Sequence, residues 1–226
     1  MEPSTVRKRV WKVWNTAKNV LSTLLFVWLI THHIAQATVV PTESMVPTIL
    51  VGDHFILDKV AFPANYPGAI EKFLPTRTVR RGEIVAFWSP VDPNLRLVKR
   101  VIGLPGETIE IRDKAVYING NKLVEPYAVF SGTPGFAQRD NLPPTTIPAD
   151  SFFMMGDNRD NSNDSRFWGF AKRKDLIGTP VFVYWSYDSD PYRPNMTIVE
   201  SLERYGSEAL HFFTKTRWDR TGTILR

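Results

Sequence analysis

The chain has no cysteine among its 226 residues. This absence excludes disulfide bonds, cysteine-ligated zinc and a thiol nucleophile. It does not fix the compartment, because an exported protein can also lack cysteine. Global disorder is excluded as well, since 43% of the residues are hydrophobic and only 23% are charged. The length suits one domain with additional segments, or two small domains.

Acidic side chains are almost missing from the start of the chain. Residues 1–18 hold five basic side chains and one acidic one, which gives +4 of the total net charge of +5. The remaining residues are therefore close to neutral. A nucleic-acid-binding domain would instead spread positive charge over a folded face. We expect a basic cytoplasmic head over 1–18 and no nucleic-acid partner.

The segment that follows the head contains no Asp, Glu, Lys or Arg from residue 19 to residue 42. As a helix it would measure about 36 Å, which exceeds the hydrocarbon core of about 30 Å. We predict a single transmembrane signal-anchor helix over 19–37, with the N-terminus in the cytoplasm and the body outside. Three alternatives remain open: a cleavable signal peptide ending near Ala35-Gln36-Ala37, an amphipathic helix lying on the bilayer, and a buried helix of a soluble protein.

The remainder, 38–226, is expected to be an extracytoplasmic β domain. Sixteen of the seventeen prolines follow residue 40, which disfavours long helices there. Short apolar or alternating runs bounded by Gly, Pro and turn dipeptides predict several strands. These strands cover 53–59, 83–88, 95–102, 108–111, 115–118, 151–155 and 179–185. The pattern predicts a mostly β fold with partly closed, barrel-like antiparallel sheets.

Two segments of this body differ from the rest. Residues 130–148 are rich in Pro, Gly and Thr and are predicted to form an exposed loop. Residues 196–214 repeat apolar side chains at helical spacing, which predicts a helix. The pattern favours packing of this helix against the core, and a helix lying on the membrane is the alternative.

A serine lies in a constrained turn directly after the apolar segment, because Ser44 is flanked by Pro41 and Pro47. A serine in a turn is usually only a local hydrogen-bonding residue, and a nucleophilic serine needs a base. The chain has neither a G-x-S-x-G elbow nor an S-x-x-K motif. Of the four histidines, His32 and His33 lie in the apolar segment, His211 lies in 196–214, and His54 could be an ordinary surface histidine, so lysine is the other candidate base.

Lys99 lies inside the apolar run 95–102, next to Arg100. Because side chains alternate along a strand, one of the two can face solvent while the other is buried with Leu97 and Val101. A free lysine, with a pKa of about 10.4, cannot accept a proton at neutral pH, and burial lowers that pKa by up to about 3–5 units. The alternative is an ordinary lysine whose amine reaches solvent.

The polar segment 156–169 has the composition of a calcium-binding loop but does not match the EF-hand pattern. Counted from Asp160, position six of an EF-hand loop would be Ser165 rather than Gly, and position twelve would be Ala171 rather than Glu. We expect no metal there. Four charged side chains of this segment are instead expected to pair among themselves and hold the loop rigid: Asp157, Arg159, Asp164 and Arg166.

Taken in order, these motifs resemble those of bacterial type I signal peptidases over residues 38–185. The motifs are Pro-Thr-Glu-Ser-Met-Val-Pro-Thr at 41–48, Gly-Asp at 52–53 through Lys59, Arg-Gly-Glu-Ile-Val at 81–85, the run 98–107, and 156–169. The resemblance implies a Ser–Lys endopeptidase without cofactor or metal, anchored in the bacterial cytoplasmic (inner) membrane. It would cleave N-terminal signal peptides from exported preproteins after small residues of the A-x-A type. Its partners would be these preproteins, at the translocon exit, and the lipid bilayer.

The resemblance also implies roles for single residues. Ser44 would be the nucleophile and Lys99 the general base, with the Ser44 backbone N–H and the Thr42 hydroxyl as oxyanion donors. Ser162 would orient Lys99. The charged residues of 156–169 named above would support the site. Two shallow apolar pockets for the small substrate residues would be lined by Val40, Met45, Phe55, Leu97 and Val98.

Two other functions are compatible with parts of the pattern. One is a related Ser–Lys peptidase, either a self-cleaving repressor or an enzyme dedicated to pilin or conjugation precursors. A repressor would carry a DNA-binding head, whereas this head leads into an apolar segment. The other is a membrane-tethered β-module that binds peptides without cutting them. The presence of both Ser44 and Lys99 disfavours that module.

Overall fold

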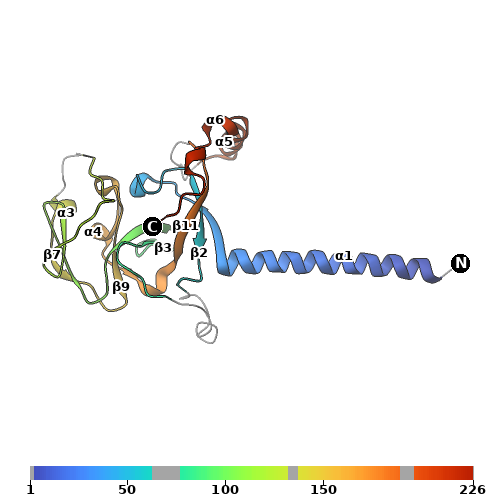
Figure 1. Cartoon of the computed structure of the whole chain (residues 1–226), viewed down its shortest axis with the longest axis horizontal. Helices are drawn as coiled ribbons and strands as arrows, with labels where there is room; N and C mark the ends of the chain where they lie inside the picture. Colours follow the sequence, from blue (N-terminus) through green and yellow to red (C-terminus); the bar gives the residue numbers. More distant parts are fainter. Residues whose placement is uncertain (1–2, 63–76, 132–136, 189–195, 226) are drawn as a thin grey trace.

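The computed structural model describes residues 3–62, 77–131, 137–188 and 196–225 (Figure 1). Helix α1 (Pro3–Leu29) and the π-helical turn η1 (Ile30–Ile34) project away from a strand-rich body. Within these described ranges, Arg7–Ile34 is the one helix long and apolar enough to cross a membrane, and the apolar part is not buried against the body.

The helical segment differs in its bounds from the prediction. It starts within the basic head, and residues 35–37, predicted as the end of the span, belong instead to strand β1 (Ala35–Val39). The cause is tertiary pairing, because β1 lies antiparallel to β2 (Asp53–Asp58), with Ala35 opposite Asp58 and Val39 opposite His54. The backbone groups of 35–39 are therefore satisfied by a neighbouring strand rather than by a helix.

Within the described parts of the chain, the body is built from two antiparallel sheets, which confirms the predicted mostly β fold. The larger one has seven strands in the order β1-β2-β11-β3-β4-β9-β10 and the smaller one has four in the order β7-β6-β5-β8. The bounds of the other strands are β3 (Ile84–Trp88), β4 (Arg96–Gly103), β5 (Thr108–Arg112), β6 (Ala115–Ile118), β7 (Asn121–Lys122), β8 (Leu142–Thr146), β9 (Ser151–Met155), β10 (Ala171–Lys172) and β11 (Leu176–Ser186). Short helices lie between the strands: η2 (Glu43–Met45), α3 (Ala137–Asp140), η3 (Arg159–Asn161), α4 (Ser165–Trp168) and η4 (Arg173–Asp175). The turn η5 (Trp218–Arg220) follows the last strand.

Strand β3 shows how the large sheet is buried on both faces. Ile84 and Ala86 belong to one apolar cluster, whereas Val85 and Phe87 belong to another. Successive side chains of a strand point to opposite faces, so β3 separates two cores. Its neighbour β4, which carries Lys99, pairs with β3 on one side and with β9 on the other. Lys99 therefore lies on an interior strand of the sheet rather than on an edge strand.

The segment 130–148 is not the simple exposed loop that its composition predicted. Its described part contains α3 and the strand β8, and residues 132–136 lie outside the described ranges. Thr146 pairs with Thr108 and Thr145 with Ile109, which makes β8 an edge strand of the small sheet. Proline is tolerated on an edge strand, because its missing N–H can face away from the ladder.

The segment 196–214 contains the helices α5 (Ile198–Leu210) and α6 (Phe212–Lys215). Thr197 and Glu200 form a reciprocal capping box that fixes the start of α5. The favoured packing of its apolar side chains against the core is wrong, because neither helix buries a residue and the apolar side chains are exposed. Helical periodicity predicts an amphipathic helix, but it does not tell which face turns toward the protein.

The close approach of β11 and β2 generates a stability prediction. A Cβ at Gly178 would collide with the backbone carbonyl of Asp58, which cannot move without disrupting the strand pair. We expect Gly178→Ala to lower the free energy of unfolding by about 1–3 kcal/mol, measured by chemical unfolding in detergent. The matched control is Gly206→Ala in α5, where no atom lies near the new methyl group, and it should raise stability by up to about 1 kcal/mol. Equal stability of the two variants would contradict the strand packing described here.

Candidate active site

Ser44 lies in the 3₁₀ turn η2, between β1 and β2. Its neighbour Met45 is fully buried, and the Met45 carbonyl accepts a hydrogen bond from Ile49 N at 2.9 Å. Asp53 Oδ2 accepts from Leu50 N at 2.9 Å, which closes the loop. These anchors hold the Ser44 side chain in a fixed place, where it is only 6% exposed.

Lys99 approaches Ser44 from β4, and its Nζ is hydrogen-bonded to Ser44 Oγ. The lysine is 3% exposed, so it does not reach solvent as an ordinary strand lysine would. Burial lowers the pKa of Lys99 from 10.5 to about 8, while the carboxylate of Asp164 acts in the opposite direction. At pH 7 about a tenth of the molecules then carry a neutral amine next to the hydroxyl.

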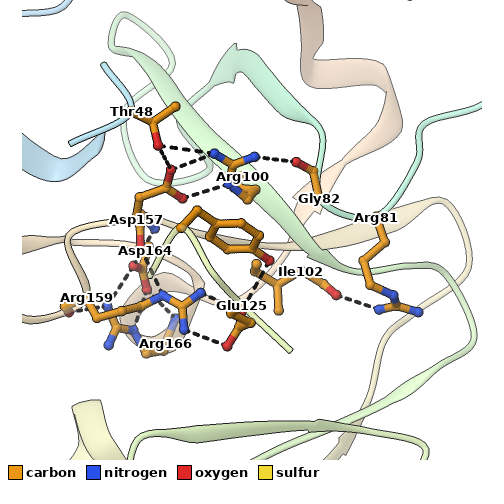
Figure 2. A network of polar contacts seen from close by, with 12 residues as sticks. Thr48, Arg81, Gly82, Arg100, Ile102, Glu125, Asp157, Arg159, Asp164 and Arg166 are labelled. Carbon is orange, nitrogen blue, oxygen red and sulfur yellow. Dashed lines mark hydrogen bonds and ion pairs between the residues drawn. The ribbon is translucent and has the colours of Figure 1, made fainter. Parts of the chain in front are cut away.

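Arg100 is also buried, so the expectation that one of the two neighbouring cations faces solvent is wrong. Its Nε and Nη2 donate to the two carboxylate oxygens of Asp157 at 2.8 and 2.6 Å, and Nη1 donates to the Gly82 carbonyl at 2.6 Å (Figure 2). The guanidinium also lies over the ring of Tyr127, 4.1 Å from its centroid. A bidentate carboxylate and an aromatic face compensate the buried charge.

Asp157 joins three parts of the site. Besides Arg100, its Oδ2 accepts a hydrogen bond from Thr48 Oγ1 at 2.5 Å. Thr48 belongs to the loop that carries Ser44, whereas Arg100 belongs to β4, which carries Lys99. The carboxylate therefore couples the position of the serine loop to that of the lysine strand.

The other charged residues of 156–169 follow the expected pairing only in part. Arg166 binds Asp164 through two bonds of 2.8 Å, as the pairing within the segment predicted. Arg159 binds Glu125 instead, through bonds of 2.9 and 2.5 Å, and Asp157 binds Arg100 (Figure 2). Glu125 and Arg100 lie 34 and 57 residues from these partners, so no local spacing pointed to them.

The segment 156–169 also holds the backbone of the serine turn. Asn158 N donates to the carbonyl of Ser44 at 3.1 Å, and Asn158 Nδ2 donates to the carbonyl of Glu43 at 3.2 Å. Asn161 Nδ2 donates to Glu43 Oε2 at 2.9 Å. The backbone orientation at Ser44 is thus fixed by a segment more than one hundred residues away in the sequence.

Thr42 and Ser162 lie at the site in different ways. Thr42 Oγ1 lies 3.3 Å from Ser44 Oγ, within hydrogen-bonding distance. The predicted hydrogen bond between Ser162 and Lys99 is not formed, since Ser162 Oγ is buried and has no hydrogen-bond partner among the described residues. A Cβ at Gly156 would collide with both Ser162 Oγ and the Ser44 carbonyl oxygen, so Ser162 lies beside the serine turn.

Four of the five predicted pocket residues lie together. Val40, Met45 and Phe55 belong to one buried cluster, and Val98 packs against it. Leu97 packs against a different cluster, because it extends from the opposite face of β4. Leu97 therefore does not join the other four. Among the residues that the structure describes, no group of three or more His, Asp or Glu side chains is arranged to hold a metal ion.

Comparison with known proteins identifies related chains. The family model described as signal peptidase, peptidase S26, matches residues 13–185. Signal peptidase I of Leptolyngbya laminosa is 38% identical over 159 residues, 67% of this chain and 70% of the relative. Signal peptidase I of Pseudomonas aeruginosa is 35% identical over 211 residues, 79% of this chain and 74% of the relative. A crystal structure of a signal peptidase I from Enterococcus faecalis is 36% identical and matches 46% of this chain and 97% of that chain with a TM-score of 0.38.

The Arg100–Asp157 pair generates a second stability prediction. Asp157→Asn keeps the shape of the side chain but leaves a buried guanidinium without its carboxylate. We expect a loss of about 3–5 kcal/mol in the free energy of unfolding, measured by chemical unfolding in detergent. The matched control is Asp150→Asn, which removes the exposed ion pair with Arg173 and should change stability by less than about 0.5 kcal/mol. Indistinguishable stabilities would show that the buried pair contributes no more than the exposed one.

Proposed function

Since the chain belongs to the signal peptidase I family, peptidase S26, we propose that it cleaves signal peptides with Ser44 as nucleophile and Lys99 as general base. The observation that carries the assignment of residues is the buried hydrogen bond between Lys99 Nζ and Ser44 Oγ. A serine hydroxyl is a weak nucleophile until an adjacent base removes its proton. Lys99 is the titratable group that touches this hydroxyl, and its lowered pKa suits that task.

The first half of the reaction is acyl transfer. The lone pair of neutral Lys99 Nζ takes the Ser44 proton while Ser44 Oγ forms a bond to the carbonyl carbon of the small residue before the cut. The carbonyl oxygen becomes an oxyanion. When the C–N bond breaks, the protonated Lys99 gives its proton to the leaving amine. The products are an acyl-serine and the free N-terminus of the mature protein.

The oxyanion is stabilised by the backbone N–H of Ser44 and the hydroxyl of Thr42. Thr42 is supported in this role by its hydroxyl, which lies 3.3 Å from the attacking oxygen. The backbone N–H is supported by the hydrogen bonds from Asn158 that fix the serine turn. A donor of this kind contributes about 2.7–4 kcal/mol to transition-state stabilisation, provided that it does not have to reorganise.

The second half of the reaction returns the enzyme to its starting state. Neutral Lys99 takes a proton from water, the resulting hydroxide bonds to the acyl carbon, and the acyl–oxygen bond to Ser44 breaks. Lys99 then returns the proton to Ser44 Oγ. In this cycle Ser162 orients the amine of Lys99. The Ser162 hydroxyl is buried beside the serine turn and has no hydrogen-bond partner among the described residues. It is therefore available to the Lys99 amine when that amine gains or loses its proton.

The remaining predicted residues serve the site indirectly. Asp157, Arg159, Asp164 and Arg166 hold the segment 156–169 rigid through their buried ion pairs. Apolar side chains beside the serine form the floor of the pockets for the small substrate residues, alanine above all. This floor consists of Val40, Met45, Phe55 and Val98, and Leu97, which packs against a different cluster, is not part of it.

The membrane anchor determines where the substrate is met. Helix α1 spans the cytoplasmic membrane with the basic residues of the head on the cytoplasmic side, so the catalytic body lies outside. Only η1, β1 and a short link separate the span from Ser44. A signal peptide also keeps its apolar segment in the bilayer. Enzyme and preprotein therefore meet at the membrane surface, at the translocon exit, with a raised effective concentration.

The catalytic pair is tested by two substitutions in the full-length protein in liposomes. Ser44→Ala should abolish processing of a precursor with an A-x-A cleavage site, because no nucleophile remains. Lys99→Met, which keeps the apolar stem, should lower the rate by about 10²–10⁴-fold. The measurement is conversion of precursor to mature protein on a gel. The control is Lys172→Met at the exposed position of β10, which should process normally. A normal rate in Lys99→Met would remove the base from the proposal.

The pH profile follows from the sign of the pKa shift. Lys99 is active when neutral, and burial lowers its pKa to about 8. The value of kcat/KM for the precursor should therefore rise about tenfold per pH unit below that pKa and level off above it. The Lys172→Met control should give the same curve. A profile that keeps rising to the pKa of free lysine, about 10.4, would mean that burial does not activate the amine.

A further inference from the structure

The helices α5 and α6 present an apolar surface away from the protein. In α5 the side chains of Ile198, Leu202 and Tyr205 recur at helical spacing and share one side. Ile198, Leu202, Leu210 and Phe213 are 81%, 65%, 84% and 78% exposed. We name this surface the outer face. It consists of Ile198, Val199, Leu202, Tyr205, Leu210 and Phe213.

The side of α5 that turns toward the body is polar. Ser201, Arg204, Ser207 and Glu208 are its partly buried residues. The Tyr187 hydroxyl donates to the Ser207 carbonyl at 3.4 Å, and Arg204 pairs with Glu208 at 3.0 Å on this inner side. A surface helix normally turns its apolar stripe toward the protein core. In α5 the arrangement is reversed. The apolar outer face points away from the protein, and the described part of the protein core does not cover it.

The helix pair is firmly attached, so its orientation is fixed by the fold. Phe212 stacks on Trp185 of β11, with ring centroids 5.9 Å apart. Trp185 Nε1 donates to Thr216 Oγ1 at 3.1 Å. The capping box of Thr197 and Glu200 defines the start of α5. The outer face is thus held outward by an aromatic contact and hydrogen bonds.

The position of the helix pair relative to α1 indicates what covers this surface. Strand β1 continues α1 and neighbours β2, which pairs with β11, the strand that carries Trp185. In Figure 1, α5 and α6 lie beside the body at about the same level along the axis of α1 as its junction with β1. A bilayer crossed by α1 would end at this level. The surface of that bilayer would therefore lie at the level of the outer face.

The net charge of the segment excludes electrostatic attraction to lipid headgroups as the main cause of a contact with the membrane. Residues 196–225 contain four basic and four acidic side chains, so their net charge is zero. Apolar and aromatic side chains in a neutral amphipathic helix favour insertion at the boundary of headgroups and acyl chains, about 5–10 Å deep. The segment also follows residue 185, where the family match ends, so the family match does not cover it.

We propose that α5 and α6 lie in the interface of the bilayer that α1 spans, with the outer face among the acyl chains. This gives the body two attachments to the membrane instead of one. A single helix would let the body tilt and rotate about it, whereas two attachments fix the height and orientation of Ser44 above the lipid. The contact is independent of peptidase activity, so its test does not depend on the proposed function.

Because the chain has no cysteine, a single introduced cysteine can be labelled at a chosen position. Leu202→Cys places a single thiol on the outer face, and Lys122→Cys places one in the exposed β7, which Figure 1 shows on the side of the body away from α1. Each full-length variant is labelled with an environment-sensitive fluorophore and reconstituted into phosphatidylcholine vesicles. Nitroxides on the acyl chains quench labels in the bilayer, and iodide quenches labels in water.

The label at 202 should be quenched several-fold more strongly by the acyl-chain nitroxide than by iodide, and the label at 122 should show the reverse. Adding anionic phosphatidylglycerol should not change the result, since the segment is neutral. Free access of iodide to the label at 202 would overturn the proposal. So would protection from both quenchers with energy transfer between labels of two copies, because the outer face would then be a contact between protein chains. Leu202 is exposed, so the substitution leaves the core intact, and an unfolding midpoint equal to that of the Lys122→Cys variant checks this.

Discussion

The site depends on keeping one amine uncharged against a hydroxyl inside the protein. Lowering the pKa of Lys99 from 10.5 to about 8 corresponds to about 3 kcal/mol of differential stabilisation, which the fold supplies by burial. Carboxylates near the amine would reverse this shift if they paired with it. The two that act most strongly on it, Asp164 and Asp157, are each bound by an arginine, Arg166 and Arg100. The arginine pairs therefore have an electrostatic consequence, because they satisfy the carboxylates that would otherwise hold the lysine protonated.

The same pairs also explain the mechanical organisation of the site. Ser44 comes from the loop after β1, Lys99 from β4, and the segment 156–169 follows β9. Asp157 binds both Thr48 of the first part and Arg100 of the second, and Asn158 binds the backbone at Ser44. Three distant pieces of sequence are thus held together by a small number of polar contacts. These buried contacts hold Ser44 and Lys99 in the geometry that the proposed proton transfer requires, and a preorganised site of this kind favours electrostatic catalysis.

The sequence predicted some of these features for identifiable physical reasons. The strands were predictable because short apolar runs end at glycine, proline or turn dipeptides. Ser44 and Lys99 were paired in the prediction only through the resemblance of their motifs to a known family, and the structure brings the two side chains into contact. The partners Arg100 and Glu125 were missed because ion pairs across tens of residues leave no local pattern. The strand β8 was missed because its prolines resemble a loop, and only an edge position tolerates them. The predicted orientation of α5 was wrong because periodicity shows that a helix has an apolar face but not which way that face points.

Titration of the Lys99 amine itself shows whether burial keeps this group neutral. Lysine labelled with ¹³C and ¹⁵N gives a side-chain signal that follows protonation by nuclear magnetic resonance, and comparison with the Lys99→Met protein assigns it. We expect a titration midpoint near 8 for this lysine in the folded, detergent-solubilised protein. A midpoint near the value of a free lysine, about 10.4, would contradict it, because the amine would then be almost fully charged at neutral pH.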